Sequence, residues 1–67
     1  MEKFAERLKE LRQDNGLSIH GLAKEVKISS SSLCRWENCQ SEAKGSQLII
    51  LAKYFDVTID YLMGLED

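Results

Sequence analysis

Apolar residues recur along the chain at intervals of three and four positions, and no segment alternates in the way of a strand. Such spacing places the apolar residues on one face of a helix. Four segments carry it: Phe4, Leu8 and Leu11; Leu22, Ala23 and Val26; Leu33 and Trp36; and Leu48, Leu51, Ala52 and Phe55. The pattern predicts four helices, and a short fifth helix is expected between Thr58 and a stop at Gly64.

Residues that favour helix ends stand next to these segments. Serine and threonine are good N-caps because the hydroxyl accepts a hydrogen bond from a free backbone N–H. We expect Ser18, Ser29, Ser46 and Thr58 to cap the second to fifth helices. The Asn-Gly pair at residues 15–16 predicts the end of the first helix, since glycine adopts the left-handed conformation that follows many helices.

The consecutive serines at residues 29–32 admit two interpretations: a flexible linker, or the capped first turn of a helix. Leu33, Trp36 and Glu37 fall on one side of that helix and need packing partners, which favours the helix. The residues on the opposite side are Ser31, Cys34, Arg35 and Asn38, with Ser30 at its edge.

The length of 67 residues predicts one domain, residues 1–67, whose stability depends on efficient helix packing or on a second subunit. No apolar run approaches the ~20 residues of a membrane-spanning helix, and the N-terminus lacks a signal-peptide stretch. We therefore expect a cytoplasmic protein without a membrane partner. Two cysteines, Cys34 and Cys39, are too few for the disulfide framework of a secreted domain.

Charge is distributed unevenly, although the formal net charge of −2 does not by itself indicate nucleic-acid binding. Residues 1–16 are balanced, residues 17–45 are slightly basic, and the acidic residues concentrate in residues 46–67. A polyanionic partner, if there is one, is therefore expected at the middle segment.

Two short helices joined by a turn of three or four residues, the second with an exposed polar face, form a helix-turn-helix. The stretch LSIHGLAKEVKISSSSLCRWEN, residues 17–38, resembles this motif in the Cro/repressor (XRE-like) family of bacteria and phages. The similarity extends to LKELRQDNGLS before it and to LIILAKYFDVTIDYLMGLED after it. The resemblance implies an all-α, five-helix lambda-repressor-like domain, with its helix-turn-helix at about residues 18–38.

The resemblance also implies a function: sequence-specific binding of double-stranded DNA, as a homodimeric repressor on a palindromic operator. In such docking the N-terminal residues of the recognition helix meet the base edges. The residues expected to contact bases are Ser30, Ser31, Cys34 and Arg35. Those expected to contact the DNA backbone are Ser18, Ser29, Asn38 and His20. An ordinary solvent-exposed role stays open for Arg35 and for His20.

Some positions depart from the family pattern. Ile19 replaces a common glutamine, Lys27 replaces a common turn glycine, and residues 41–43 replace a basic loop that contains proline. Fewer cations release fewer counterions, which lowers nonspecific affinity for DNA. These departures favour an alternative function as a protein-interaction module, such as an antitoxin or anti-repressor partner, in which DNA binding is secondary.

Catalytic, metal and cofactor roles receive little support. No serine has a plausible partnered base, and so short a chain has little room for a substrate cleft. Cys34, Cys39 and His20 lack a fourth metal ligand, and binding would bend the third helix. We expect no enzymatic activity, no metal site and no cofactor.

Two structural expectations concern single residues. Glu37 is expected to pair with Arg12, because a carboxylate on the inward face of the third helix is costly unless it is paired. The family resemblance points to the same pair. Lys27 is expected at positive φ, in the turn before the third helix.

A symmetric dimer is expected to form through the C-terminal part of the chain. Ile50 and Tyr54 fall on the outer face of the fourth helix. Tyr61, Met63 and Leu65 lie on or beside a fifth helix that is too short to bury all three.

Overall fold

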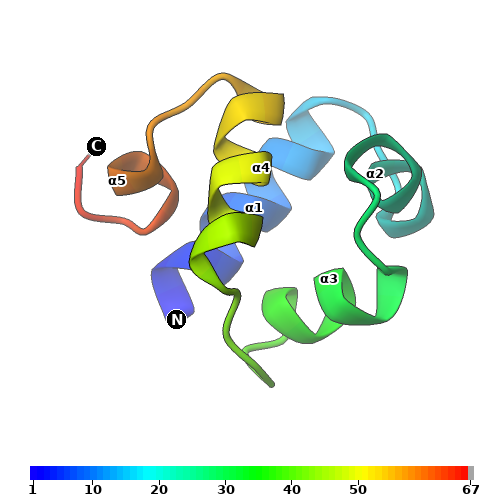
Figure 1. Ribbon diagram of the computed structural model, residues 1–67, viewed down its shortest axis with the longest axis horizontal. Coiled ribbons are helices and arrows are strands. Elements are labelled where there is room, and N and C mark those ends of the chain that lie inside the picture. The colour runs from blue at the N-terminus through cyan, green and yellow to red at the C-terminus, as the bar shows by residue number, and fades with distance from the viewer. Residues whose placement is uncertain (67) are drawn as a thin grey trace.

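The computed structural model describes residues 1–66, which form five helices and no strand (Figure 1). The helices are α1 (Glu2–Asp14), α2 (Ile19–Val26), α3 (Ser30–Glu37), α4 (Gly45–Phe55) and α5 (Ile59–Leu62). The predicted all-α class and the five helices are confirmed. Within the described residues, no helix has the length and apolar character needed to cross a membrane.

Three of the four predicted N-caps are confirmed. The hydroxyls of Ser18, Ser29 and Thr58 each accept a hydrogen bond from the backbone N–H three residues later. These caps fix where α2, α3 and α5 begin, because each satisfies a backbone donor that the helix itself leaves unpaired.

The predicted cap at Ser46 is wrong. Helix α4 begins at Gly45, with Lys44 in the N-cap position, and Ser46 lies exposed in the first turn. The Lys44 N–H donates instead to the side-chain oxygen of Gln47, at 2.8 Å. A side chain that reaches back to the N-cap in this way sets the helix start without a capping hydroxyl.

All five helices contribute buried side chains to the hydrophobic core, together with Ile28 and Ala43 from the segments that connect them. Its largest fully buried side chains are Phe4, Leu8, Leu22, Leu33, Leu51 and Leu62. The rings of Phe4 and Trp36 lie with centroids 6.1 Å apart and tilted by 55°, which joins α1 to α3. Ala43 is also buried, although the loop that carries it shows no periodicity from which its burial could be predicted.

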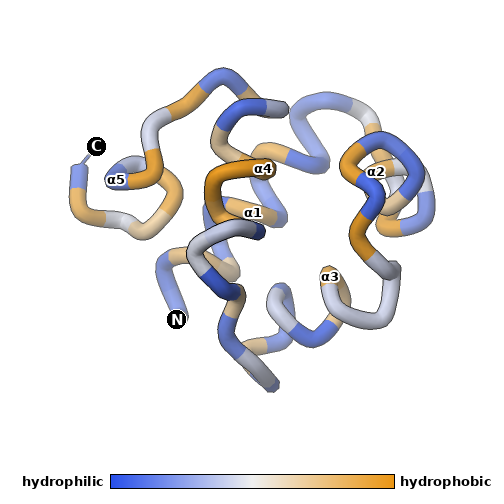
Figure 2. The backbone as a smooth tube through the Cα atoms, in the orientation of Figure 1, coloured by the Kyte–Doolittle hydropathy of each residue, from blue (hydrophilic) through white to orange (hydrophobic). Residues whose placement is uncertain are grey.

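Hydropathy differs between α4 and α3 (Figure 2). The tube of α4 is orange along its middle, whereas that of α3 is mostly pale or blue. Only Leu33 and Trp36 of α3 are buried. The apolar stripe of helix α3 is therefore narrow, and Ser31, Cys34 and Arg35 of this helix are exposed.

The predicted ion pair between Arg12 and Glu37 is confirmed. The Arg12 guanidinium donates from Nε to Glu37 Oε2 at 2.8 Å and from Nη2 to Oε1 at 3.0 Å. Its Nη1 donates to the Leu17 carbonyl oxygen at 2.8 Å. The hydrogen bond to Glu37 raises the pKa of Arg12, so the guanidinium stays charged. One side chain thereby connects α1, the turn before α2 and the end of α3.

Lys27 takes the left-handed backbone conformation expected from the sequence, with φ +58°. Its N–H donates to the Ala23 carbonyl oxygen at 2.9 Å, which closes α2. Cys39 and Asp56 take the same conformation after α3 and α4. A residue with a Cβ is strained there by ~1–2 kcal/mol, so three turns of this small domain store strain.

Glycine is required where the C-terminal segment passes α1. Gly64 has φ +80°, and a Cβ built on it would lie 2.4 Å from the Cβ of Lys3. Arg7 of α1 holds the same segment: its guanidinium lies 4.1 Å from the ring centroid of Tyr61. Its Nη1 also donates to the carbonyl oxygens of Tyr61 and Glu66, both at 3.2 Å.

Breaking the internal ion pair should destabilise the fold strongly. The side chains of Arg12 and Glu37 are only 12% and 7% exposed, so Glu37→Gln leaves a nearly buried cation without its partner. We expect a loss of ~3–5 kcal/mol in the free energy of unfolding, measured by urea denaturation.

Two variants complete this test. Glu6→Gln breaks the exposed Lys3–Glu6 pair, whose side chains are 67% and 66% exposed, and should leave the urea midpoint unchanged. The double variant Arg12→Met with Glu37→Leu should lose less than the sum of its single changes, since it leaves no unpaired charge. Equal urea midpoints for wild type and Glu37→Gln would contradict the stabilising role of the pair.

Relief of strain in the α2–α3 turn should stabilise the protein. Lys27→Gly relieves the ~1–2 kcal/mol of strain that the left-handed conformation costs a residue with a Cβ. Against this, the greater freedom of glycine in the unfolded chain costs ~0.5–1 kcal/mol in the free energy of unfolding. We expect a net gain of up to about 1.5 kcal/mol, seen as a melting temperature several degrees higher. Lys27→Ala is the control, since it removes the same charge and keeps the strain. A Gly variant that melts no higher than the Ala variant would refute the strain at this turn.

Candidate nucleic-acid interface

Helix α3 presents the polar face that the sequence predicts. Leu33 and Trp36 on its back are 0% and 3% exposed, and the helix packs against α1 and α2. The exposed residues on its front are Ser31, Cys34, Arg35 and Asn38, and Ser30 at the edge is half-buried. In Figure 1, α3 lies along the lower edge of the molecule, on the side away from α5. A duplex major groove is wide enough to admit a helix presented in this way.

The serines at both helix starts are engaged in capping, and they differ in whether the hydroxyl hydrogen is already used. Ser29 Oγ accepts from the Ser32 N–H at 3.2 Å and donates to Ser32 Oγ at 2.9 Å. Ser18 Oγ accepts from the Gly21 N–H at 2.9 Å. A hydroxyl that accepts one hydrogen bond still has its own hydrogen, so Ser18 can donate to a phosphate. Ser29 already donates to Ser32 and would have to exchange that bond for a phosphate contact.

Asn38 ends α3 and positions Cys34. Its side-chain amide donates to the Cys34 carbonyl oxygen at 2.8 Å and lies 3.4 Å from Cys34 Sγ. The backbone N–H of Asn38 donates to the same carbonyl at 3.0 Å. A contact from the Asn38 amide to a phosphate would therefore compete with its hydrogen bond to the Cys34 carbonyl oxygen at the end of α3.

A shallow notch of about 360 Å³ lies where the first turn of α2 meets the start of α3. It is lined by Ile19, His20, Ser30, Ser31 and Cys34. Three of these residues were predicted base contacts and one a predicted backbone contact. From the sequence, Ile19 was expected only to lack the hydrogen bonds of the glutamine that is common at this position. A role of Ile19 on this surface could have been predicted from its position directly after the Ser18 cap, in the first turn of α2.

The charges of the exposed side chains favour an anionic partner on this side. Glu37 is neutralised by Arg12, so it does not act on a ligand of α3. The exposed cations of residues 17–45 are Lys24, Lys27, Arg35 and Lys44, and the exposed carboxylates are Glu25 and Glu42. The structure thus makes the middle segment more cationic at its surface than its formal charge indicates.

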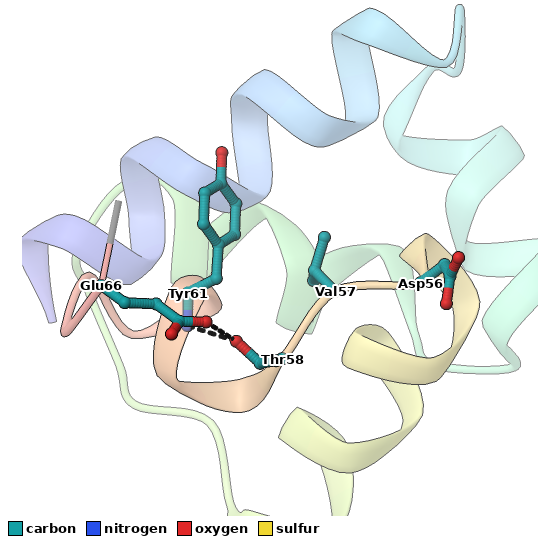
Figure 3. A pocket seen from close by; sticks show the side chains of 5 residues that line it. All are labelled: Asp56, Val57, Thr58, Tyr61 and Glu66. Atoms are coloured by element: carbon teal, nitrogen blue, oxygen red, sulfur yellow. Dashed lines mark hydrogen bonds between the residues drawn. The ribbon is translucent and has the colours of Figure 1, made fainter.

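A second concavity, of about 400 Å³, lies at the opposite end of the molecule and is shown in Figure 3. Its lining residues are Asp56, Val57, Thr58, Tyr61 and Glu66. The Glu66 carboxylate reaches back to accept a hydrogen bond from the Thr58 hydroxyl. Two carboxylates at this site repel a polyanion, so a nucleic acid is expected at α3 and not here.

The predicted dimer residues are unequally exposed. Leu65 is 78% exposed, Ile50 42% and Tyr54 38%. Tyr61 is partly covered by Arg7, and Met63 packs against the core. Ile49 and Ile59, at 45% and 39%, are exposed as well and were not predicted. Exposed apolar surface therefore concentrates on the outer side of α4 and around α5.

The thiols and acidic residues do not gather into a metal site. Cys34 and Cys39 are both exposed and not bonded to each other. Within residues 1–66, no three His, Cys, Asp or Glu side chains lie close enough together to hold a metal ion. His20 is exposed in the first turn of α2, as expected.

Comparison with known proteins agrees with this geometry. The sequence model of the HTH_3 (Helix-turn-helix) family matches residues 8–62. The chain belongs to this helix-turn-helix family.

Two relatives and one solved structure resemble the chain. It is 34% identical over 64 residues to the uncharacterized HTH-type transcriptional regulator YobD of Bacillus subtilis (strain 168), covering 96% of this chain and 57% of that protein. It is 31% identical over 65 residues to the HTH-type transcriptional activator BcrR of Enterococcus faecalis, covering 97% of this chain and 32% of that protein. A crystal structure of an HTH_3 family transcriptional regulator from Vibrio cholerae superposes with a TM-score of 0.83 at 23% identity, over 97% of this chain and 36% of that one. The chain thus spans between about a third and somewhat more than half of these proteins.

Proposed function

We propose that the chain is a sequence-specific DNA-binding domain of a transcriptional regulator, with α3 as its recognition helix. The observation that carries the proposal is the division of α3 into a buried apolar back and an exposed front of small polar side chains with one arginine. The relatives are named as an HTH-type transcriptional regulator and an HTH-type transcriptional activator, and both names support a role in transcription regulation.

The base-reading residues in this proposal are Ser30, Ser31, Cys34 and Arg35. Small side chains in the first turn let the helix N-terminus come close to the duplex, and Arg35 reaches further. Its guanidinium fork matches the O6 and N7 acceptors of guanine. Ser18, Ser29, Asn38 and His20 lie beside this face and contact phosphates, which fixes the position of the helix without reading sequence.

The proposed binding unit is a homodimer on a palindromic operator, acting as a repressor. Two recognition helices must sit ~34 Å apart to read half-sites one helical turn apart. The described residues carry a single α3, so in this proposal the second α3 comes from another copy of the chain. Repression is favoured because occupancy of the operator suffices to block transcription, whereas activation requires a further contact.

A protein-interaction module is the second candidate function. Five large apolar side chains are exposed, and a protein partner that covered them would remove their surface from water, which favours this function. They are Ile49, Ile50, Tyr54, Ile59 and Leu65. A gel shift with random-sequence duplex at low salt separates the two candidates. Binding that weakens steeply with salt supports DNA as the ligand. No shift at micromolar protein supports the module.

Loss of Arg35 should relax specificity at one base pair in each half-site. Arg35→Ala is expected to cost ~1–3 kcal/mol on a selected operator and much less on random duplex. Fluorescence anisotropy with both duplexes measures the difference. Lys24→Ala is the matched control, since it removes an exposed cation from α2 and should weaken both duplexes by the same factor. Equal losses on both duplexes for Arg35→Ala would make Arg35 a phosphate contact.

Charge introduced into the dimer surface should separate the subunits. Leu65→Asp and Ile50→Asp replace exposed side chains, so they should leave the fold intact and place an unpaired carboxylate in the interface. Sedimentation velocity at tens of micromolar should show a dimer for wild type and a monomer for both variants. Lys9→Asp, at an exposed position of α1 that is not among the predicted interface residues, should remain dimeric. A wild type that is monomeric both free and on operator DNA would refute the dimer.

A further inference from the structure

We propose that the notch between α2 and α3 is a subsite for a thymine base, with Ile19 and Cys34 holding its C5-methyl group. This inference rests on the proposed DNA binding and makes Ile19 a specificity-determining residue. The notch is open toward the same side as the exposed front of α3, and it is built by both helices of the motif.

The side chains that line the notch have the chemistry of a thymine edge. In the major groove thymine presents one methyl group beside one acceptor, the O4 oxygen. Ile19 supplies a branched apolar wall and Cys34 a polarisable sulfur, both suited to a methyl group. Ser30 and Ser31 supply hydroxyl donors within the same notch, suited to O4. No other base offers this pair of features in the major groove.

Both apolar walls are held in place by contacts within the chain. Ile19 is partly buried and packs against the hydrophobic core, and it directly follows the Ser18 cap that fixes the start of α2. Cys34 Sγ lies 3.4 Å from the amide nitrogen of Asn38, which also bonds the Cys34 carbonyl. A methyl group entering the notch therefore meets a formed site, and its binding orders little further structure.

The apolar wall also accounts for the residue type at position 19. An isoleucine cannot hydrogen-bond to DNA, and leaving its outer part in water gains nothing. Covered by a methyl group, the same surface is removed from water. Where a glutamine at position 19 could hydrogen-bond to DNA, the isoleucine contacts a thymine methyl group instead. The position therefore still contributes to sequence specificity.

Replacement of thymine by deoxyuridine tests the inference, since it deletes only the methyl group. An operator is first selected from random duplex with the wild-type protein, and each thymine is then replaced singly. We expect one thymine in each half-site whose replacement weakens binding about fourfold, the factor for burying one methyl group. Every other replacement should change the affinity far less.

Variants assign that effect to the notch. In Ile19→Ala and in Cys34→Ser the thymine and deoxyuridine operators should bind with nearly equal affinity, whereas Ile49→Ala should keep the fourfold ratio. Cys34 is exposed, so its serine variant tests the site even if Ile19→Ala folds poorly. A ratio near one for every thymine in wild type, or a fourfold ratio that survives both notch variants, would overturn the assignment. Absence of any duplex binding at low salt would instead refute the proposed function, and the subsite with it.

Discussion

The contact between Arg12 and Glu37 holds together the parts of the molecule on which the proposed interface depends. It fixes α3 against α1 through two hydrogen bonds and holds the turn before α2 through the Leu17 carbonyl oxygen. Helix α3 has only eight residues and buries only Leu33 and Trp36, so its apolar stripe alone constrains its rotation weakly. A bidentate ion pair has a definite geometry, which apolar contacts lack. The front of α3 therefore points outward because its back is fixed both by packing and by charge.

The same contact changes the electrostatics of the proposed binding surface. Glu37 is the only acidic residue of α3, and an unpaired carboxylate there would repel phosphates close to the recognition face. Its pairing with Arg12 leaves Arg35 as the free charge of that helix. Two acidic residues of the C-terminal part, Asp56 and Glu66, line the concavity at the other end of the molecule. An overall negative charge is thereby compatible with one face suited to DNA.

In the proposed function, the α2–α3 end of the molecule binds DNA and the α4–α5 end forms the dimer. The α2–α3 end offers a notch and a polar helix face, both presented by short helices with capped starts. The α4–α5 end offers exposed apolar side chains on α4 and at Leu65, and Arg7 bonds the Tyr61–Glu66 segment that carries Leu65 to α1. Because α1 contacts both α3 and α5, the spacing between a dimer interface and the recognition helices is set by one continuous helix. Changes at Arg7 are thus expected to affect the dimer side, and changes at Arg12 the DNA side.

The sequence by itself determined the helices, most of their caps, the left-handed turn at Lys27 and the Arg12–Glu37 pair. The helices and caps follow from local chemistry, and the ion pair from the rule that a carboxylate facing the core needs a partner. The turn at Lys27 follows from the family resemblance, which places a common glycine at that position. The start of α4 was misplaced because Gln47 caps it from inside the helix, a contact that competes with the equally plausible cap at Ser46. Only the tertiary structure decided three other features: the burial of Ala43, the contact of the Arg7 guanidinium with the Tyr61 ring, and the notch at Ile19. Each arises between segments that are distant in sequence or belong to different helices, and helical periodicity describes one helix at a time.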